Sequence, residues 1–191
     1  PCPVIGMIGI IDDWKQAKGC GLINAGKAIF VVGQNGDVND GWLGCSVYAR
    51  EIAGREGGAP PSVEPILEEK NGSLIRQAIA NELIEAAHDI SDGGLLVALA
   101  EMVIAGQCGA KITCPDSGSL HGWAFGEDQA CYIAVVSDVP AFTALCAASD
   151  VEAIQIGETI SECELTLAGL PPISKEDMAA WHRKTIDDLM A

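Results

Sequence analysis

Residues 87–96 read AHDISDGGLL, and the order of residue types in this segment predicts the local fold. An apolar approach leads into a polar turn, and two glycines then open a long apolar run. This order predicts a strand, a tight turn and the N-terminus of a buried helix. Because the first N–H groups of a helix are unpaired, polar side chains at such a junction can meet a ligand.

Strands and helices are predicted on both sides of this segment. Strands are predicted at 4–11, 28–33, 86–90, 109–114, 131–137, 153–160 and 164–168, and the last two are expected to pair as neighbours. Helices are predicted at 65–83 with a bend near Asn71 and Gly72, at 92–106 ending at Gly106, at 139–149, and at 174–190 with Ser174 as N-cap. The mixed order favours an α/β fold, a sandwich with a mixed sheet.

Two segments and one helix carry further predictions. The Gly- and Asp-rich segment 34–44 and the Gly- and Pro-rich segment 54–65 are expected to be exposed connections, the first pinned to the body by Trp42. The helix at 92–106 is apolar nearly all round. We expect it to be covered on several sides, either by the sheet and other helices or by a partner chain.

Composition bounds the possible functions. The 191 residues, 49% of them hydrophobic, suffice for one core of good size. The formal net charge of −16 repels nucleic acid and anionic membranes. No apolar run approaches the ~20 residues of a membrane span. Neither nucleic acid nor a membrane is expected as a partner.

The cysteines and the chain start indicate the protein's setting. Eight cysteines occur without a C-x-x-C pair, and we interpret them as reduced, mostly buried thiols of a cytoplasmic protein rather than a zinc or disulfide framework. The chain opens Pro1-Cys2-Pro3 without an initiator Met or signal-type segment. We therefore expect it to be a piece of a longer chain.

The first candidate site is the turn with Asp89, Ser91, Asp92, Gly93 and Gly94. A helix N-terminus attracts anions, but two carboxylates oppose a bare phosphate. A phosphate bridged through Mg²⁺, a ribose diol or an ammonium group fits better. The alternative is structural: Ser91 or Asp92 caps the helix, and backbone N–H groups and His88 hold Asp89.

The second candidate site follows Gly126, where Glu127, Asp128 and Gln129 precede an apolar strand. These side chains either face a small polar ligand or form an acidic turn. His88 could be oriented by Asp89 for proton transfer, or it is a satisfied structural residue. The sequence carries no phosphate-binding loop and no nucleophile elbow, so we assign neither a catalytic residue nor a metal ligand.

Three stretches together resemble one family. AHDISDGGLLVALAEM, the later FGEDQ and the opening PCPVIGMIGIIDD are similar to the C-terminal part of the phosphoribosylformylglycinamidine synthase family, which shows T-P-V-I-G, HD-hydrophobic-SDGGL and FGESQ. The resemblance covers essentially the whole chain. The HD-x-SDGG element alone also occurs in the wider superfamily of aminoimidazole ribonucleotide synthetase, selenophosphate synthetase and thiamine monophosphate kinase.

The resemblance implies a fold and an activity. Residues 1–191 would form a single C-terminal-type domain with α/β/α layering in a longer multidomain chain. The parent would be an ATP- and Mg²⁺-dependent ligase of purine biosynthesis that activates the amide oxygen of formylglycinamide ribonucleotide by phosphoryl transfer. Ammonia derived from glutamine then displaces that oxygen. Implied partners are the upstream domains, a glutaminase subunit, a small accessory subunit and a small-molecule nucleotide.

The resemblance carries site roles to only a few positions. Residues 89–94 together with Glu127 and Gln129 become pocket-facing candidates for binding the nucleotide or substrate. Asp128 stands where the family has Ser, which argues against direct phosphate contact there. The chain alone is expected to be inactive.

Two other functions stay open. The chain could be an interaction module whose helix at 93–105 pairs with a companion domain or a second copy. It could also belong to a superfamily member with another substrate, such as a selenophosphate synthetase-like or thiamine monophosphate kinase-like enzyme.

Overall fold

A computed structural model describes residues 6–33, 42–114 and 118–190. Its centre is a seven-stranded mixed sheet with strand order β2-β4-β1-β5-β3-β6-β7. The strands are β1 (Ala28–Val32), β2 (Ile84–Asp89), β3 (Gly109–Ile112), β4 (Tyr132–Val136), β5 (Ala153–Ile160), β6 (Glu164–Leu167) and β7 (Ile173–Ser174). The expected α/β fold with a mixed sheet is confirmed.

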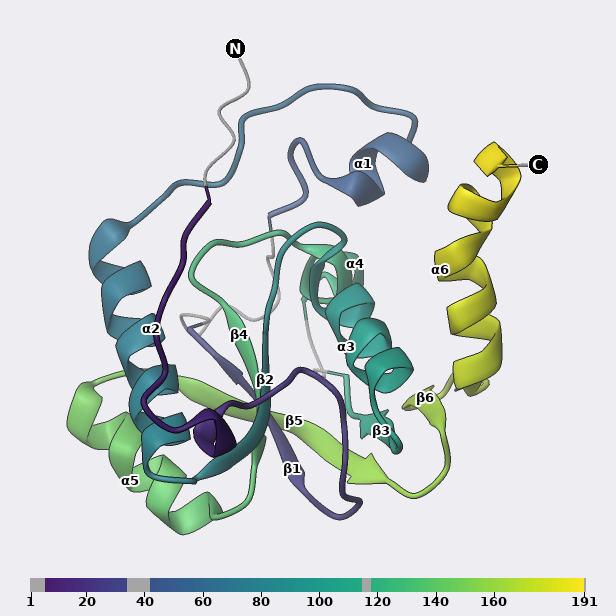
Figure 1. Cartoon of the computed structure of the whole chain (residues 1–191). Helices are drawn as coiled ribbons and strands as arrows, with labels where there is room; N and C mark the ends of the chain where they lie inside the picture. The colour runs from purple at the N-terminus through teal and green to yellow at the C-terminus, as the bar shows by residue number, and fades with distance from the viewer. Residues whose placement is uncertain (1–5, 34–41, 115–117, 191) are drawn as a thin grey trace.

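Helices cover both faces of this sheet (Figure 1). Helices α2 (Pro65–Ala80) and α5 (Val139–Ser149) lie on one side, and α3 (Gly94–Ala105), α4 (Leu120–Phe125) and α6 (Lys175–Met190) lie on the other. Strand β1 serves both layers, because Ile29 and Val31 enter one core while Phe30 and Val32 enter the other. This alternation follows from the two-residue period of a strand. The molecule therefore has three layers, with a hydrophobic core on each face of the sheet.

The expected pairing of β5 with β6 is wrong. Strand β3 lies between them, antiparallel to β5 and parallel to β6. A Cβ on Gly109 would meet the carbonyl oxygens of Glu162 and Glu164 at 2.1 Å, so the turn between β5 and β6 closes over the start of β3. Alternating hydrophobicity identifies a strand but does not identify its neighbour.

The expected strand at 4–11 is also wrong over its described part. Residues 6–11 form no strand, and Met7 and Ile8 are 94% and 102% exposed. Residues 4 and 5, and most of the predicted loop at 34–44, lie outside the described residues. The apolar pattern shows only that the segment favours burial, and no described part of the chain covers it.

Helix α2 runs without a break through Asn71 and Gly72, against the predicted bend. Asn71 is 3% exposed, and its Nδ2 donates to the carbonyl oxygen of Ala130 at 3.0 Å. This tertiary hydrogen bond satisfies the buried amide and holds the helix in its regular path. Helix propensity alone, weakened by Asn and Gly, does not include such a contact.

Helix α3 is covered within the chain. It packs on the sheet and against α4 and α6, as its apolar composition predicts. Three short elements were not predicted. They are helix α4, helix α1 (Val47–Glu51) and the single turn η1 (Trp14–Gln16). Ser119 and Ser46 cap α4 and α1, so the N-cap signal was present but the helices were too short to show periodicity.

The described cysteines are less buried than the sequence predicts. No described cysteine is paired, and the prediction that most are buried is wrong, because three of the seven are buried and two, Cys45 and Cys163, are exposed. Among the described helices, none combines the length and the apolar character that a membrane crossing needs.

Candidate functional site

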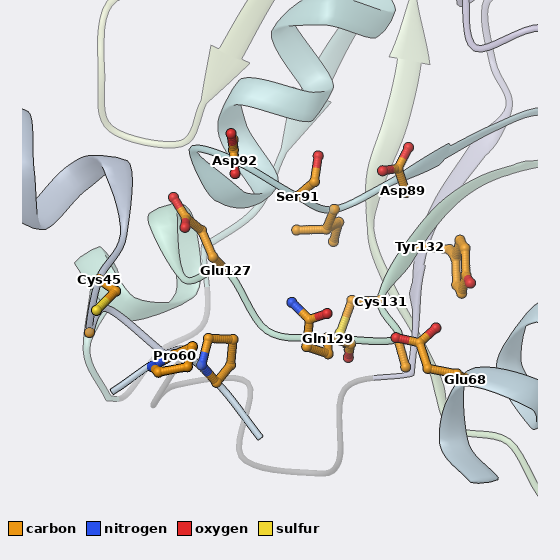
Figure 2. Close-up of a pocket in the computed structure, with 14 residues that line it drawn as sticks. Cys45, Pro60, Glu68, Asp89, Ser91, Asp92, Glu127, Gln129, Cys131 and Tyr132 are labelled. Atoms are coloured by element: carbon orange, nitrogen blue, oxygen red, sulfur yellow. Dashed lines mark hydrogen bonds between the residues drawn. The ribbon is translucent and has the colours of Figure 1, made fainter. Parts of the chain in front are cut away.

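A cavity of about 430 Å³ opens where β2 ends and β4 begins (Figure 2). Residues from the two sequence-predicted clusters lie on its walls together with residues from α2 and the loop around 60. Its lining consists of Gly44, Cys45, Pro60, Pro61, Glu68, Asp89, Ile90, Ser91, Asp92, Glu127, Gln129, Ala130, Cys131 and Tyr132. The antiparallel pairing of β2 with β4 places Asp89 opposite Tyr132, which brings the two clusters to one place.

The structure separates the predicted site residues into two groups. Asp89, Ser91, Asp92, Glu127 and Gln129 line the cavity. The two glycines that follow Asp92 are not among the lining residues and open helix α3 instead. Sequence reasoning brought the first group to one pocket only through the family resemblance, since the clusters are far apart along the chain.

Gly93 and Gly94 serve the packing of α3. Their φ angles are +85° and +75°, in the region that favours glycine. A Cβ on Gly94 would come within 2.6 Å of the backbone of Phe125 and within 2.8 Å of the carbonyl oxygen of Gly126. Glycine at position 94 therefore allows the start of α3 to lie directly against the end of α4.

Glu127 occupies the position that a ligand anion would take at the start of α3. Its Oε1 accepts hydrogen bonds from the backbone N–H of Gly93 and of Val47, each at 2.8 Å. One carboxylate oxygen thus joins the N-termini of α3 and α1, where it also complements both helix dipoles. The structural alternative that Ser91 or Asp92 caps α3 is wrong, because Gly93 is the N-cap and makes no side-chain cap.

Asp128 fastens the loop that forms the far wall. Its Oδ2 accepts from the N–H of Trp42 at 2.9 Å, and the N–H of Glu127 donates back to the carbonyl oxygen of Trp42 at 2.9 Å. The indole Nε1 of Trp42 donates to the carbonyl oxygen of Ala59 at 2.9 Å. Trp42 therefore pins this part of the chain, as predicted, and Asp128 is committed to a backbone group.

His88 stands outside the cavity lining and links β2 to α3. Its Nδ1 lies 2.7 Å from the carbonyl oxygen and 3.3 Å from Oδ1 of Asp89, while its Nε2 lies 3.5 Å from Oε2 of Glu101. The ring therefore has a partner on each nitrogen. These contacts support the structural interpretation of His88.

The cavity is acidic. Glu68, Asp89, Asp92 and Glu127 contribute carboxylates, and none of the lining residues that the structure describes is Lys, Arg or His. Burial raises the pKa of the Cys131 thiol to about 12, with Asp128 adding to the rise. The Cys131 thiol therefore stays protonated at neutral pH. A lining of carboxyl groups and this thiol suits hydroxyl, amine or cation partners rather than a bare phosphate.

Several lining residues were missed by sequence reasoning. Glu68 comes from α2, and Cys45, Pro60 and Pro61 come from loops, so only tertiary structure brings them to the cavity. Tyr132 lies three residues after Gln129, at the start of β4, so only its position in the sheet brings it to the cavity. Burial raises the pKa of the Tyr132 phenol, which keeps its O–H available as a donor.

The described carboxylates do not form a metal site by themselves. Within the described residues, no group of three or more His, Cys, Asp or Glu side chains is placed to hold a metal. Mg²⁺ at nucleotide sites usually takes one or two protein carboxylates together with phosphate oxygens and water. Asp89 and Asp92 could supply these one or two carboxylates. The residues therefore suit Mg²⁺ only when phosphate oxygens of a nucleotide complete its coordination.

Sequence comparison finds close relatives along the whole chain. The subunit PurL of phosphoribosylformylglycinamidine synthase from Methylocella silvestris is 43% identical over 193 residues, covering 100% of this chain and 26% of that protein. The same subunit from Azorhizobium caulinodans is 41% identical, covering 95% of this chain and 24% of that protein. The chain thus spans about a quarter of the length of these relatives.

Solved structures share the fold. PurL of Thermotoga maritima complexed with FGAR aligns with a TM-score of 0.67 at 17% identity, covering 87% of this chain and 30% of that one. The hydrogenase maturation protein HypE of Escherichia coli aligns with a TM-score of 0.54 at 18% identity, covering 83% of this chain and 51% of that one.

A protein-family model also matches most of the chain. The model of the AIR synthase related protein, C-terminal domain, matches residues 24–169. This match contains β1 to β6, the cavity and both predicted clusters. The chain therefore belongs to the family of AIR synthase related proteins and carries that family's C-terminal domain.

Proposed function

We propose that this chain is a C-terminal-type domain, spanning residues 1–191, of an ATP-dependent amidine-forming ligase. The parent enzyme would convert formylglycinamide ribonucleotide to formylglycinamidine ribonucleotide with ammonia taken from glutamine. The observation that carries this proposal is the match along the full length of the chain to relatives named as the PurL subunit of that synthase. The weaker structural likeness to HypE gives no reason to prefer another substrate.

In this proposal the cavity is one wall of a small-molecule site. Asp89, Ser91, Asp92 and Gln129 would hold hydroxyl or amine groups, or the Mg²⁺ that accompanies a nucleotide, because carboxylate and amide oxygens accept hydrogen bonds and bind hard cations. Bound Mg²⁺ would neutralise phosphate charge. Glu127 would not bind the ligand directly. Its hydrogen bonds to Val47 and Gly93 would hold the helix starts that position the binding groups.

The cavity does not hold a complete set of groups for phosphoryl transfer. Its described lining residues include no Lys or Arg, so we propose that positive charge for a transferred phosphate comes from other parts of the parent protein or from the metal. The remaining domains of the same polypeptide would therefore complete the site. A glutaminase subunit and a small accessory subunit would assemble with the parent enzyme, which we place in the cytoplasm.

A chimera tests this function. The segment of the Methylocella silvestris relative that matches this chain is replaced by the chain, and product formation from formylglycinamide ribonucleotide, ATP and ammonia is measured. We expect product from the chimera and none from the chain alone. Turnover by the chain alone, or a folded chimera without activity, contradicts the proposal.

Matched variants of the chimera test the cavity. Asp92→Asn removes a carboxylate from the cavity, and Glu69→Gln removes one from the exposed face of α2 outside it. We expect kcat/KM to fall at least about tenfold for Asp92→Asn, a loss of about 1.4 kcal/mol in transition-state stabilisation. Glu69→Gln is expected to retain full activity. Equal activities of the two variants contradict a role for the cavity.

A further inference from the structure

The start of β3 and the turn between β5 and β6 bring two cysteines together. Strand β3 pairs with β6 in parallel, with Ala110 opposite Leu165. Cys108 directly precedes β3 and Cys163 directly precedes β6, so both cysteines lie at the same end of these two parallel strands. Neighbouring strands lie about 4.8 Å apart, inside the Cα separation of about 4.4–6.8 Å that a disulfide requires.

Side-chain and backbone contacts also bring the two segments together. The Cys163 Sγ lies 3.2 Å from the carbonyl oxygen of Gln107, the peptide group that joins Gln107 to Cys108. The turn at 162–164 closes so tightly over Gly109 that no Cβ fits there. Lys175 fixes the turn from its other side, because its N–H donates to the carbonyl oxygen of Cys163 at 2.9 Å.

The two thiols differ in the way that a sensing pair requires. Cys163 is exposed, while Cys108 is 8% exposed and donates to the carbonyl oxygen of Ile23. Burial raises the pKa of the Cys108 thiol, and the neighbouring Cys163 adds to the rise. An oxidant in solution therefore reacts with the exposed Cys163 first, and the buried Cys108 is the second thiol that can react with oxidised Cys163.

We propose that Cys108 and Cys163 form a reversible disulfide when the protein meets a peroxide. The Cys163 thiolate attacks the peroxide, an S–O bond forms, the O–O bond breaks, and water leaves to give a sulfenic acid. The sulfur of Cys108 then loses its proton and bonds to the sulfur of Cys163, and the sulfenic oxygen leaves as a second water. Two thiols are oxidised and one peroxide is reduced to two waters, and a small thiol reverses the bond.

The consequence for the structure is a covalent tie between the connection that follows α3 and the turn between β5 and β6. The side chain of Lys175 donates to the carbonyl oxygen of Gly106, the C-cap of α3, so the bond forms inside an already fixed cluster. A disulfide would close the loop between Cys108 and Cys163. This closure restricts the unfolded chain and raises the melting temperature. This inference is independent of the proposed ligase activity.

The chain is treated with hydrogen peroxide, digested without reductant and analysed by mass spectrometry. We expect one linked peptide pair, joining Cys108 to Cys163, which dithiothreitol separates. The melting temperature of the oxidised chain should rise by about 5 °C. Accumulation of sulfinic acid on Cys163 without the linked pair, or a link from Cys163 to any other cysteine, overturns the proposal.

Two variants control the assignment. Cys163→Ser should abolish the linked pair and the rise in melting temperature. Cys45→Ser removes the other exposed described cysteine and should leave both unchanged. Because both substitutions are at exposed positions, neither is expected to prevent folding. An equal rise in melting temperature in oxidised Cys163→Ser contradicts the proposal.

Discussion

Glu127 shows how a residue of the candidate site can act through structure. Its carboxylate faces the cavity and also satisfies two backbone donors, at the starts of α3 and α1. A ligand anion would compete with this side chain for the N-terminus of α3. The residue therefore shapes the site by excluding anions from a place that would otherwise attract them.

Glu127→Ala is expected to destabilise the protein by about 2–4 kcal/mol, because two partly buried N–H groups lose a charged acceptor. Glu127→Gln keeps an acceptor oxygen and should lose less. Urea unfolding followed by circular dichroism measures both. Glu69→Ala, at an exposed position of α2, serves as the control and should change the unfolding free energy by less than about 0.5 kcal/mol. A loss for Glu127→Ala no larger than that of the control contradicts the capping role.

Two glycines allow the cost of a positive φ angle to be measured separately from the cost of steric crowding. Gly94 and Gly26 have nearly equal φ angles of +75° and +76°, but a Cβ at 94 meets Phe125 at 2.6 Å and a Cβ at 26 meets nothing within 4 Å. Gly26→Ala should cost about 1 kcal/mol from conformation alone. Gly94→Ala should cost at least about 2 kcal/mol more, because the backbone of Phe125 must move. Equal melting temperatures for the two variants would show that the contact at Gly94 is relaxed without cost.

At the scale of elements, local patterns predicted most strands and helices, and tertiary partners explain the failures. The predicted helix at 139–149 matches α5 at its observed bounds, and the predicted helix at 92–106 matches α3 within two residues of its start. The order of strands did not follow, because β3 enters between two strands that are adjacent in sequence. For the site, the turn at 89–92 was visible in the sequence, whereas the contribution of Glu68 depends on how α2 packs.

Gly72 in the middle of α2 offers a stabilising substitution. A Cβ there would meet Arg76 and Tyr132 side chains at 3.4 and 3.5 Å, which is ordinary contact. Gly72→Ala should therefore raise the unfolding free energy by about 0.5–1 kcal/mol through helix propensity. Thermal unfolding measures the change. Gly94→Ala, at the start of another helix, should change stability in the opposite direction, and a loss of stability in Gly72→Ala contradicts the argument.

An ion pair couples strands that are not neighbours. Lys27, just before β1, contacts Glu85 of β2 at 3.0 Å, and β4 lies between these two strands. Burial alone would raise the pKa of Glu85, but hydrogen bonds from Asn24 and Lys27 outweigh it and lower the pKa below 4.5. The pair therefore stabilises the fold above pH 4.5 and loses its effect as pH falls through the lowered pKa.

Glu85→Gln tests this coupling. At pH 7 the variant should be less stable than the parent by about 1 kcal/mol, and the difference should shrink as the pH is lowered below about 4.5. Urea unfolding across this pH range measures it. Glu158→Gln, at an exposed position of β5, is the control and should show no such trend. A difference that grows toward acid pH has the wrong sign for this mechanism.

At the scale of the whole molecule, the apolar segment 6–11 stands apart from both cores. Met7, Ile8 and Ile10 are 94%, 102% and 95% exposed, while α3 is covered by its own chain. Association through α3 is therefore less favourable than association through this segment. An extended apolar segment with free backbone edges pairs readily with another strand.

Sedimentation at several concentrations tests this difference. The chain should associate, and Ile8→Asp combined with Ile10→Asp should weaken association at least about tenfold. Val97→Ser, at an exposed apolar position of α3, should leave association unchanged. Association that depends on Val97 and not on Ile8 would restore the helix at 93–105 as the interaction surface.

The insertion of β3 between β5 and β6 has a consequence for synthesis on the ribosome. β3 has left the exit tunnel long before either of its partners, which begin at Ala153 and Glu164. Until those residues emerge, the nascent chain holds an unpaired apolar strand, a condition that promotes misassembly. A pause in translation before β5 and β6 have left the exit tunnel would therefore lengthen the period in which chaperones are needed, whereas a pause after both have left it would not.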